Sequence, residues 1–324
     1  MYFVARNVQR QDLDACFLFA QARYGYADSE RAAVTGLWKA LLESKMALMH
    51  VVEDQDQSRG QRLVLFGCVS AVNQAFLGAI KEGPQFHVDL AALDWWSVGR
   101  SLQPSPGEYE REHVALGLTF VNLFVAMDML RYGPVERMEA FEIGSSFFQG
   151  AIARKRIWEY VEQSYGEQER ERLTLLGLSE ARVYPEAAER PKGQKGAPCL
   201  FAGVNEDVRK EPRLRQTVAG RFAWTKAPRF NFSPFDHEVL GLALDGRTDQ
   251  EIAAELKISL AAIKKRWQGV FIRVETVDSQ FFDLGESQSP GALQRNRRRQ
   301  LMRVLRQHPE EFWPAALPLS KSYF

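Results

Sequence analysis

Four cations and no carboxylate lie between Ser259 and Val274, in a segment that continues the stretch "TDQEIAAELKISLAAIKKRW" from Thr248. Lysine and arginine contact phosphates, and lysine and glutamine donate hydrogen bonds to base edges in the major groove of DNA. A carboxylate on the same side would repel the phosphate backbone. The segment therefore predicts a DNA-contacting helix whose outward residues are Ser259, Ala261, Lys264, Lys265 and Gln268.

A second basic segment, "QRNRRRQLMRVLRQHPEEFWP", begins at Gln294 and has six arginines before its proline. Leu301, Met302 and Leu305 would give a helix here one apolar side. We predict that Arg295, Arg298 and Arg299 contact phosphates. Two alternatives remain: a solvated basic face, or a packing helix whose arginines pair with the acidic N-terminal half.

Local signals define the helices that must position these side chains. Ser233 and Thr248 are each followed by an acidic residue at the third position, which is the capping-box pattern, and Ser259 can cap a third helix. On that third helix, the apolar residues fall within one narrow stripe that should pack inward: Ile263, Trp267, Val270 and Val274.

The region from about Phe230 to Glu275 resembles the helix-turn-helix of LuxR-type transcriptional regulators, through "EVL", "DGRTDQEIAAEL" and "ISLAAIKKRW". The resemblance implies sequence-specific binding of double-stranded DNA, and regulators of this kind usually bind as homodimers. Two other interpretations are a sigma-like factor, which shares the "EVL…EIA…IK" arrangement, and a small helical bundle without a DNA-binding function.

Strands and helices alternate in the N-terminal half: "YFVARNV" indicates a strand, two helices follow, and "ALMHVVED" and "QRLVLFGCVSAVNQAF" indicate two more strands. This order resembles that of GNAT-type N-acetyltransferases. The resemblance implies a splayed pair of strands and a loop that cradles the CoA pyrophosphate at a helix N-terminus. The nearest match to that loop is "FEIGSS", with Gly144 and Ser146 as candidate cofactor-binding residues; alternatively, Gly144 lies in an ordinary helix.

Charge divides the chain into two parts. Residues 1–189 hold 19 Lys and Arg against 26 Asp and Glu, a net of −7, whereas residues 190–324 hold 23 against 15, a net of +8. A basic part fused to an acidic part suggests that only the C-terminal half meets a polyanion. The Pro- and Gly-rich stretch "YPEAAERPKGQKGAPC" between them is typical of a linker.

No stretch approaches the roughly 18 apolar residues that a membrane span needs, and no signal-peptide pattern opens the chain, so we expect a cytoplasmic protein without a membrane partner. The three cysteines are far apart, which argues against a disulfide framework and a CxxC metal site. Cys16 and Cys68 lie in apolar segments and should belong to the core. We expect neither a metal site nor catalytic residues.

Together these features predict an α+β chain: a mixed α/β domain over residues 1–184, a linker over 185–228, a helix-turn-helix domain over 229–276 and a basic extension over 277–324. The predicted function is a DNA-binding transcriptional regulator whose N-terminal domain senses a small-molecule ligand or a partner. That function needs no cofactor and is not enzymatic. The alternative is an acetyl-CoA-dependent N-acetyltransferase fused to a DNA-targeting module.

Overall fold

The computed structural model places the chain in two compact units, which we describe separately. The N-terminal unit comprises residues 1–152 and 157–224, and the C-terminal unit comprises residues 153–156 and 225–324. The structure describes residues 2–44, 46–83, 87–115, 117–128, 131–152, 154–184, 198–204, 228–282 and 290–312, and a few between 207 and 217.

One seven-stranded sheet, in the order β1-β2-β3-β4-β5-β7-β6, forms the centre of the N-terminal unit. All neighbouring strands are antiparallel except β4 and β5, which are parallel. The strands are β1 (Phe3–Asn7), β2 (Ala47–Asp54), β3 (Leu63–Ala71), β4 (Leu118–Met127), β5 (Ile157–Tyr165), β6 (Ser179–Val183) and β7 (Pro198–Val204).

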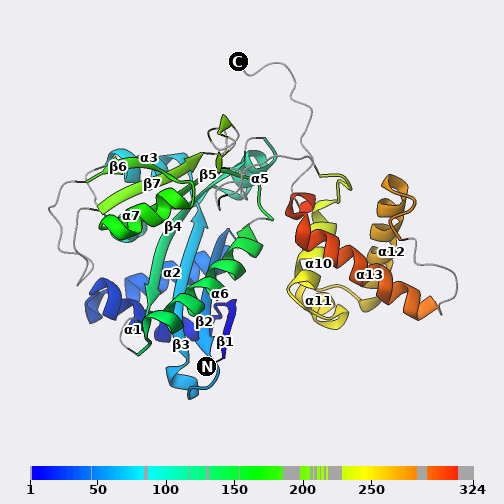
Figure 1. The fold of residues 1–324 in the computed structure, drawn as a ribbon, viewed down its shortest axis with the longest axis horizontal. Helices are drawn as coiled ribbons and strands as arrows, with labels where there is room; N and C mark the ends of the chain where they lie inside the picture. Colours follow the sequence, from blue (N-terminus) through cyan, green and yellow to red (C-terminus); the bar gives the residue numbers. More distant parts are fainter. Residues whose placement is uncertain are drawn as a thin grey trace. The chain divides into compact units, whose positions relative to one another are not determined.

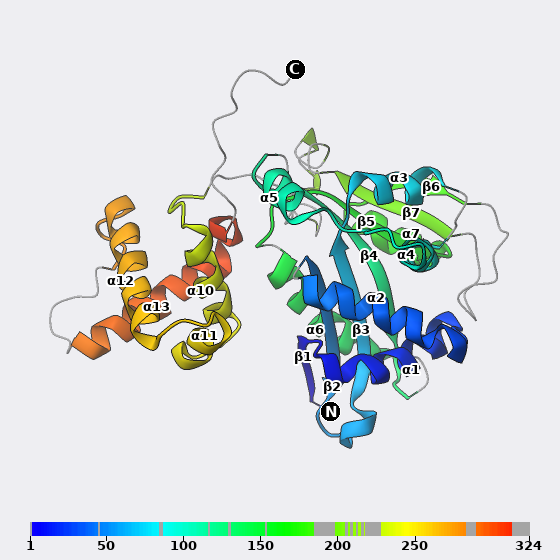
Figure 2. The same ribbon diagram turned by 180° about the vertical axis from the view of Figure 1, so that it is seen from behind.

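Helices cover both faces of this sheet. Seven of the described helices are α1 (Leu13–Tyr24), α2 (Arg31–Ser44), α3 (Gln74–Glu82), α4 (Val88–Ser97), α5 (Pro106–Ala115), α6 (Pro134–Ile152) and α7 (Glu167–Leu175). Short 3-10 turns occur at η1 (Arg10–Asp12), η2 (Asp28–Glu30) and η3 (Arg59–Gln61). Helices α6 and α7 lie in front of the sheet in Figure 1, whereas α1 and α2 lie in front of it in Figure 2.

Burial explains the two-sided packing. In β3, every residue from Val64 to Ala71 is buried, as expected for a strand that is covered on both faces. The largest cluster lies on the side of α1 and α2, where the fully buried Trp38 indole packs edge-on against Phe66 at a centroid distance of 4.8 Å. Cys16 and Cys68 both belong to this cluster, which confirms their predicted place in the core.

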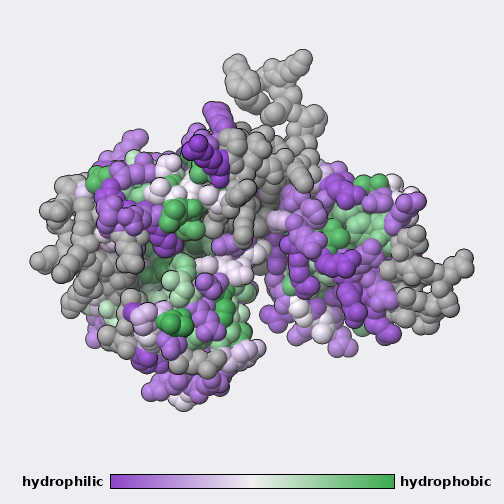
Figure 3. Space-filling model, viewed as in Figure 1, coloured by the Kyte–Doolittle hydropathy of each residue, from purple (hydrophilic) through white to green (hydrophobic). Residues whose placement is uncertain are grey.

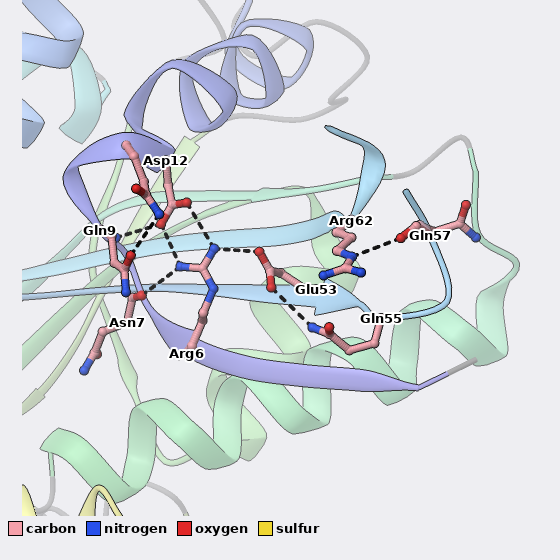
Figure 4. A network of polar contacts seen from close by, with 9 residues as sticks. Arg6, Asn7, Gln9, Asp12, Glu53, Gln55, Gln57 and Arg62 are labelled. Carbon is pink, nitrogen blue, oxygen red and sulfur yellow. Dashed lines mark hydrogen bonds and ion pairs between the residues drawn. The ribbon is translucent and has the colours of Figure 1, made fainter. Parts of the chain in front are cut away.

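A polar network fixes the edge strand β1 (Figure 4). The Arg6 guanidinium lies 2.6 Å from an Asp12 carboxylate oxygen at the start of α1 and 2.6 Å from a Glu53 oxygen on β2. Bidentate and charge-assisted contacts of this kind add geometric specificity as well as energy. They set the position of β1 beside β2 and the direction in which the chain enters α1.

The C-terminal unit consists of α10 (Pro234–Leu244), α11 (Asp249–Glu255), α12 (Leu260–Val277), α13 (Pro290–Gln307) and the turn η5 (Pro309–Phe312). Ser233, Thr248 and Ser259 cap α10, α11 and α12 through their side chains, as predicted. One core joins these helices, with Trp267 and Val270 from α12 packed with Leu301 and Leu305 from α13.

Two expectations need correction. The predicted linker over 185–228 contains β7, which completes the sheet between β5 and β6. The predicted basic extension over 277–324 contains α13, whose apolar side is part of the same core as α10–α12.

Within the described part of the chain, no helix has the length and apolar character to cross a membrane.

Candidate active site between β4 and β5

The central parallel strands separate halfway along their length. Pairing of β4 with β5 runs from Leu118 opposite Ile157 to Val121 opposite Val161. Beyond that point β4 stays paired with β3 as far as Met127, and β5 stays paired with β7 as far as Tyr165. A bulge leaves Leu123 without a partner on β3 where the separation begins, and bulges bend and twist strands locally. The diverging strands are visible in Figure 1.

A pocket of about 180 Å³ lies beside this gap, on the face that α6 and α7 cover. Figure 3 shows apolar residues, in green, gathered at a hollow of the N-terminal unit. The apolar lining consists of Leu65, Gly67, Val69, Val125, Phe141, Gly144, Phe148, Leu176 and Leu178, and the polar lining of His50, Asn122, Ser145, Gln149, Tyr160, Glu162 and Arg172. We call it the apolar pocket.

A smaller pocket of about 90 Å³ includes residues from α1 and α4. Its lining includes three carboxylates, those of Asp89, Glu162 and Glu169, against the single cation of Arg172. We call it the acidic pocket. Both pockets share Asn122, Val125, Glu162 and Arg172, so they meet at the gap between the strands.

Polar side chains converge where the pockets meet. One Glu162 oxygen accepts a hydrogen bond from Arg172 Nη2 at 3.0 Å, and the other accepts one from the Tyr160 hydroxyl at 3.1 Å. Burial, reinforced by the Glu162 carboxylate, raises the pKa of Tyr160 well above its ordinary value of 10, so its hydroxyl remains a donor. Asn122 Oδ1 is buried without a hydrogen-bond partner in the described structure. A buried acceptor in that state favours a ligand that supplies an N–H or O–H.

Tyr24 reaches the gap from α1. Its hydroxyl donates to the Val125 carbonyl oxygen at 2.7 Å and accepts from the Val125 N–H at 2.6 Å. Beyond Val121, β4 has no strand neighbour on the side of β5, so its backbone groups there need other partners. Tyr24 satisfies one residue of this open edge and forms part of the wall of the acidic pocket.

His50 lies in the apolar pocket opposite Gly67 on β3. A Cβ on Gly67 would lie 2.4 Å from the imidazole Cε1, so only glycine leaves room for this ring. Burial lowers the pKa of His50 from 6.5 to about 4, and Nδ1 has no hydrogen-bond partner in the described structure. The ring is therefore neutral at pH 7.

The depressed pKa of His50 predicts acid sensitivity of the N-terminal unit. Between pH 6.5 and pH 4 the unfolded state binds more protons at this residue than the folded state, so the free energy of unfolding falls as the pH is lowered through this window. The expected loss at pH 5 is about 2 kcal/mol. Urea titrations of the wild type and His50→Leu at pH 7 and pH 5 measure it as a difference. Identical pH dependence in both proteins would contradict it.

The predicted pyrophosphate loop is wrong. Gly144 and Ser146 lie in the middle of α6, not at a helix N-terminus, so their N–H groups are part of the helix. Gly144 is buried because α6 packs closely there: a Cβ would lie 3.0 Å from Val52 Cγ2. The alternative, an ordinary helical glycine, is correct, and the packing on β2 and β3 is its physical reason.

The start of α6 does not fit a pyrophosphate either. Pro134 has no N–H to donate, and Glu136 lies in the first turn. The Glu136 carboxylate folds back so far that a Cβ on Gly133 would meet Oε2 at 2.6 Å. Arg131, before the helix, is committed to Asp128 and to the carbonyl oxygens of Gln61 and Leu63. Among the described residues here, a carboxylate takes the place that a phosphate would need.

The predicted DNA-contacting residues lie on α12 and α13. Ser259, Ala261, Lys264, Lys265 and Gln268 are all exposed, as are Arg295 and Arg299. Arg298 differs: its guanidinium lies 2.6 Å from Asp249 and 4.5 Å from the centre of the Trp267 ring, so it joins α13 to α11 and α12. Its predicted phosphate contact is therefore corrected to a packing role, with its carboxylate partner in the C-terminal unit itself.

Comparisons with known proteins give matches among solved structures. No protein-family model matches the chain, and no curated protein matches it. Solved structures that are similar include FeeM, an N-acyl amino acid synthase from uncultured soil microbes, at 15% identity and a TM-score of 0.37, with 66% of this chain and 97% of that chain covered. A GNAT-family acetyltransferase from Bacillus cereus has 10% identity and a TM-score of 0.32, with 63% and 98% covered. A histone-acetyltransferase-related protein from Corynebacterium glutamicum has 11% and 0.35, with 62% and 96% covered.

The strand order decides the fold. The chain opens with strand, helix, helix, strand, strand, as predicted, and its central parallel pair splays apart. The N-terminal unit has a GNAT-like fold. The start of α6 differs from the pyrophosphate loop that the sequence resemblance implied, because Pro134 and the Glu136 carboxylate lie there.

The prediction of LuxR-type transcription regulation is corrected. The similar structures are a synthase and acetyltransferases, and no family model supports a LuxR-type domain. The predicted helices occur at α10, α11 and α12, but no comparison assigns a helix-turn-helix DNA-binding function to them. The local helix signals were therefore sound as predictions of structure.

Sequence reasoning missed the residues at the gap. Asn122 is a polar residue inside the otherwise apolar strand segment "LTFVNLFVAM", and this was a usable signal. Glu162 and Arg172 come from segments that the sequence gives no reason to bring together. Only the pairing of β5 with β4 and the packing of α7 beside β5 place them at one site.

Proposed function

We propose that the GNAT-like unit transfers an acyl group from a thioester to an amine in the gap between β4 and β5. The observation that carries this proposal is the separation of the parallel strands after Val121 and Val161, with a pocket on each side that shares the lining of the gap. Such an opening lets two substrates approach one point from different directions, which raises their effective concentration.

The acidic pocket suits the amine. At neutral pH an alkyl amine arrives as an ammonium ion, and three carboxylates against one guanidinium attract a cation. Asn122 Oδ1 is the unpartnered acceptor that an N–H of the substrate would satisfy. Glu162 is held by Arg172 and Tyr160, so its carboxylate has a fixed orientation toward the gap.

The reaction forms one bond and breaks one. Glu162 takes a proton from the ammonium, and the freed nitrogen attacks the thioester carbonyl carbon. The new C–N bond forms, the C–S bond breaks, and the thiolate leaves with its electron pair. The nitrogen loses a further proton and the thiolate gains one, so an amide and a thiol are the products. In this scheme Glu162 acts as a general base, a role that contributes typically 10²–10⁴-fold to the rate.

Release of thiol, followed with a thiol reagent, and detection of amide by mass spectrometry test the proposal with a panel of acyl thioesters and amines. We expect turnover by the wild type and a drop in kcat of about 100-fold or more for Glu162→Gln. Glu171→Gln is the matched control, because Glu171 is on the same helix as Arg172, is exposed and lines neither pocket. An absence of amide with every pair, or equal kcat for Glu162→Gln and wild type, would reject acyl transfer at this site.

A further inference from the structure

We infer that the donor is recognised by an acyl chain of about six carbons or longer, seated in the apolar pocket, and not by a nucleotide. This inference rests on the proposed acyl transfer and specifies its substrate. Two observations support it: the size and lining of the apolar pocket, and the occupied start of α6.

The apolar pocket is larger than an acetyl group needs. A cavity of about 150 Å³ lined by Leu, Ile and Phe accommodates benzene, which has six carbons. The apolar pocket measures about 180 Å³, and Leu65, Phe141, Phe148, Leu176 and Leu178 supply much of its wall. A chain of two carbons would leave most of this wall without contacts, whereas each additional buried methylene favours binding by about four-fold.

The wall belongs to elements that hold it rigidly. Gly144 brings α6 close to Val52 and Leu65, and Phe148 packs against the Tyr160 ring at a centroid distance of 5.9 Å. Leu178 is 5% exposed and belongs to a core cluster with Leu173 of α7 and Val69 of β3. Because these contacts hold the wall in place, binding of the chain costs little reorganisation of the pocket.

The nucleotide end of a CoA donor has no comparable binding site at the start of α6. A helix N-terminus binds phosphate when its N–H groups are free and no carboxylate is near. At α6, Pro134 lacks the N–H and the Glu136 carboxylate covers Gly133, while the Arg131 guanidinium contacts Asp128 and two carbonyl oxygens. Affinity for the donor must therefore come from the chain and the thioester.

The test compares donors that differ in one part at a time, with the full chain and an amine that the wild type accepts. Between acetyl and hexanoyl thioesters, kcat/KM should rise by about 250-fold, since four methylenes are added at about four-fold each. Between hexanoyl-CoA and hexanoyl-pantetheine, which lacks the nucleotide, kcat/KM should change by less than about three-fold. A preference for acetyl, or a loss of about 100-fold on removal of the nucleotide, would overturn the inference.

Two tryptophan substitutions on neighbouring residues test the location. Leu176 is partly buried and lines the pocket, so Leu176→Trp should abolish the advantage of hexanoyl over acetyl. Leu175 is 79% exposed and does not line the pocket, so Leu175→Trp should retain that advantage. Equal chain selectivity in both variants would place the chain elsewhere and reject the inference.

Direct binding separates this inference from the proposed reaction. Calorimetry with the unreactive thioether analogue of hexanoyl-pantetheine should show binding that Leu176→Trp weakens at least ten-fold and Leu175→Trp does not. If this holds while no amine is ever acylated, the proposed reaction is wrong and the chain site stands. If amines are acylated but the analogue binds no better than its acetyl counterpart, the reaction stands and the chain site is wrong.

Discussion

Trp267→Ala is expected to unfold the C-terminal unit while the GNAT-like sheet remains folded. Trp267 is 2% exposed, its ring lies 5.8 Å from the Phe271 ring in a tilted arrangement, and its Nε1 donates to Asp249 at 3.2 Å. The Arg298 guanidinium also packs over the Trp267 ring, 4.5 Å from its centre. Truncation of a buried tryptophan costs about 3–5 kcal/mol, which is comparable with the whole stability of a small domain.

Circular dichroism of the full chain during urea titration should show an early loss of helix for Trp267→Ala. Ile272→Ala on the same helix is the control, because Ile272 is 63% exposed and its loss should cost less than about 0.5 kcal/mol. Equal midpoints for the two variants would show that Trp267 does not hold α11, α12 and α13 together.

Gly144→Leu should both destabilise the N-terminal unit and fill the apolar pocket. A Cβ at this position already lies 3.0 Å from Val52 and 3.4 Å from Leu65, so the larger side chain must push α6 away from the sheet. Overpacking of this kind costs about 1–3 kcal/mol. Thermal unfolding measures the cost, and calorimetry with the hexanoyl thioether should show no binding.

Gly150 on the same helix provides the contrast. A Cβ there meets nothing within 4 Å, so Gly150→Ala should raise stability by up to about 1 kcal/mol through helix propensity alone. A Gly144→Leu protein as stable as the wild type would mean that α6 can shift outward freely. In that case the pocket would not be rigid, and its volume of about 180 Å³ would not limit the size of the ligand.

The sequence-based predictions were accurate where the deciding contacts join residues that are close in sequence. Ser233, Thr248 and Ser259 cap helices through contacts three residues away, and α10, α11 and α12 begin where those residues predict. The strands β2 and β3 were also recognisable, because their apolar runs are bounded by turns. In contrast, β5 begins with "IWEYV", which follows a helix-prone stretch, and only its pairing with β4 shows that it is a strand.

The site was less predictable than the fold for the same reason. Asn122, Glu162 and Arg172 come from three separate elements, and no spacing in the chain connects them. Basic residues that are adjacent in sequence, such as Lys264 and Lys265 on α12, predict a cationic surface. Arg298 on α13 shows the limit of that reasoning, because its guanidinium is paired with Asp249, which lies 49 positions away in the sequence.

The position of β7 has a consequence for how the chain folds during synthesis. In the sheet β7 lies between β5 and β6, although it follows both of them in sequence. When the ribosome has released residues up to Val183, β5 has an unpaired edge and β6 has no partner in the native sheet. If β5 paired directly with β6 at that stage, the two strands would have to separate before β7 could insert between them. Exposed strand edges of this kind promote misfolding and aggregation, so we expect the chain to be most prone to misfolding after Tyr165 has emerged and before Val204 has emerged.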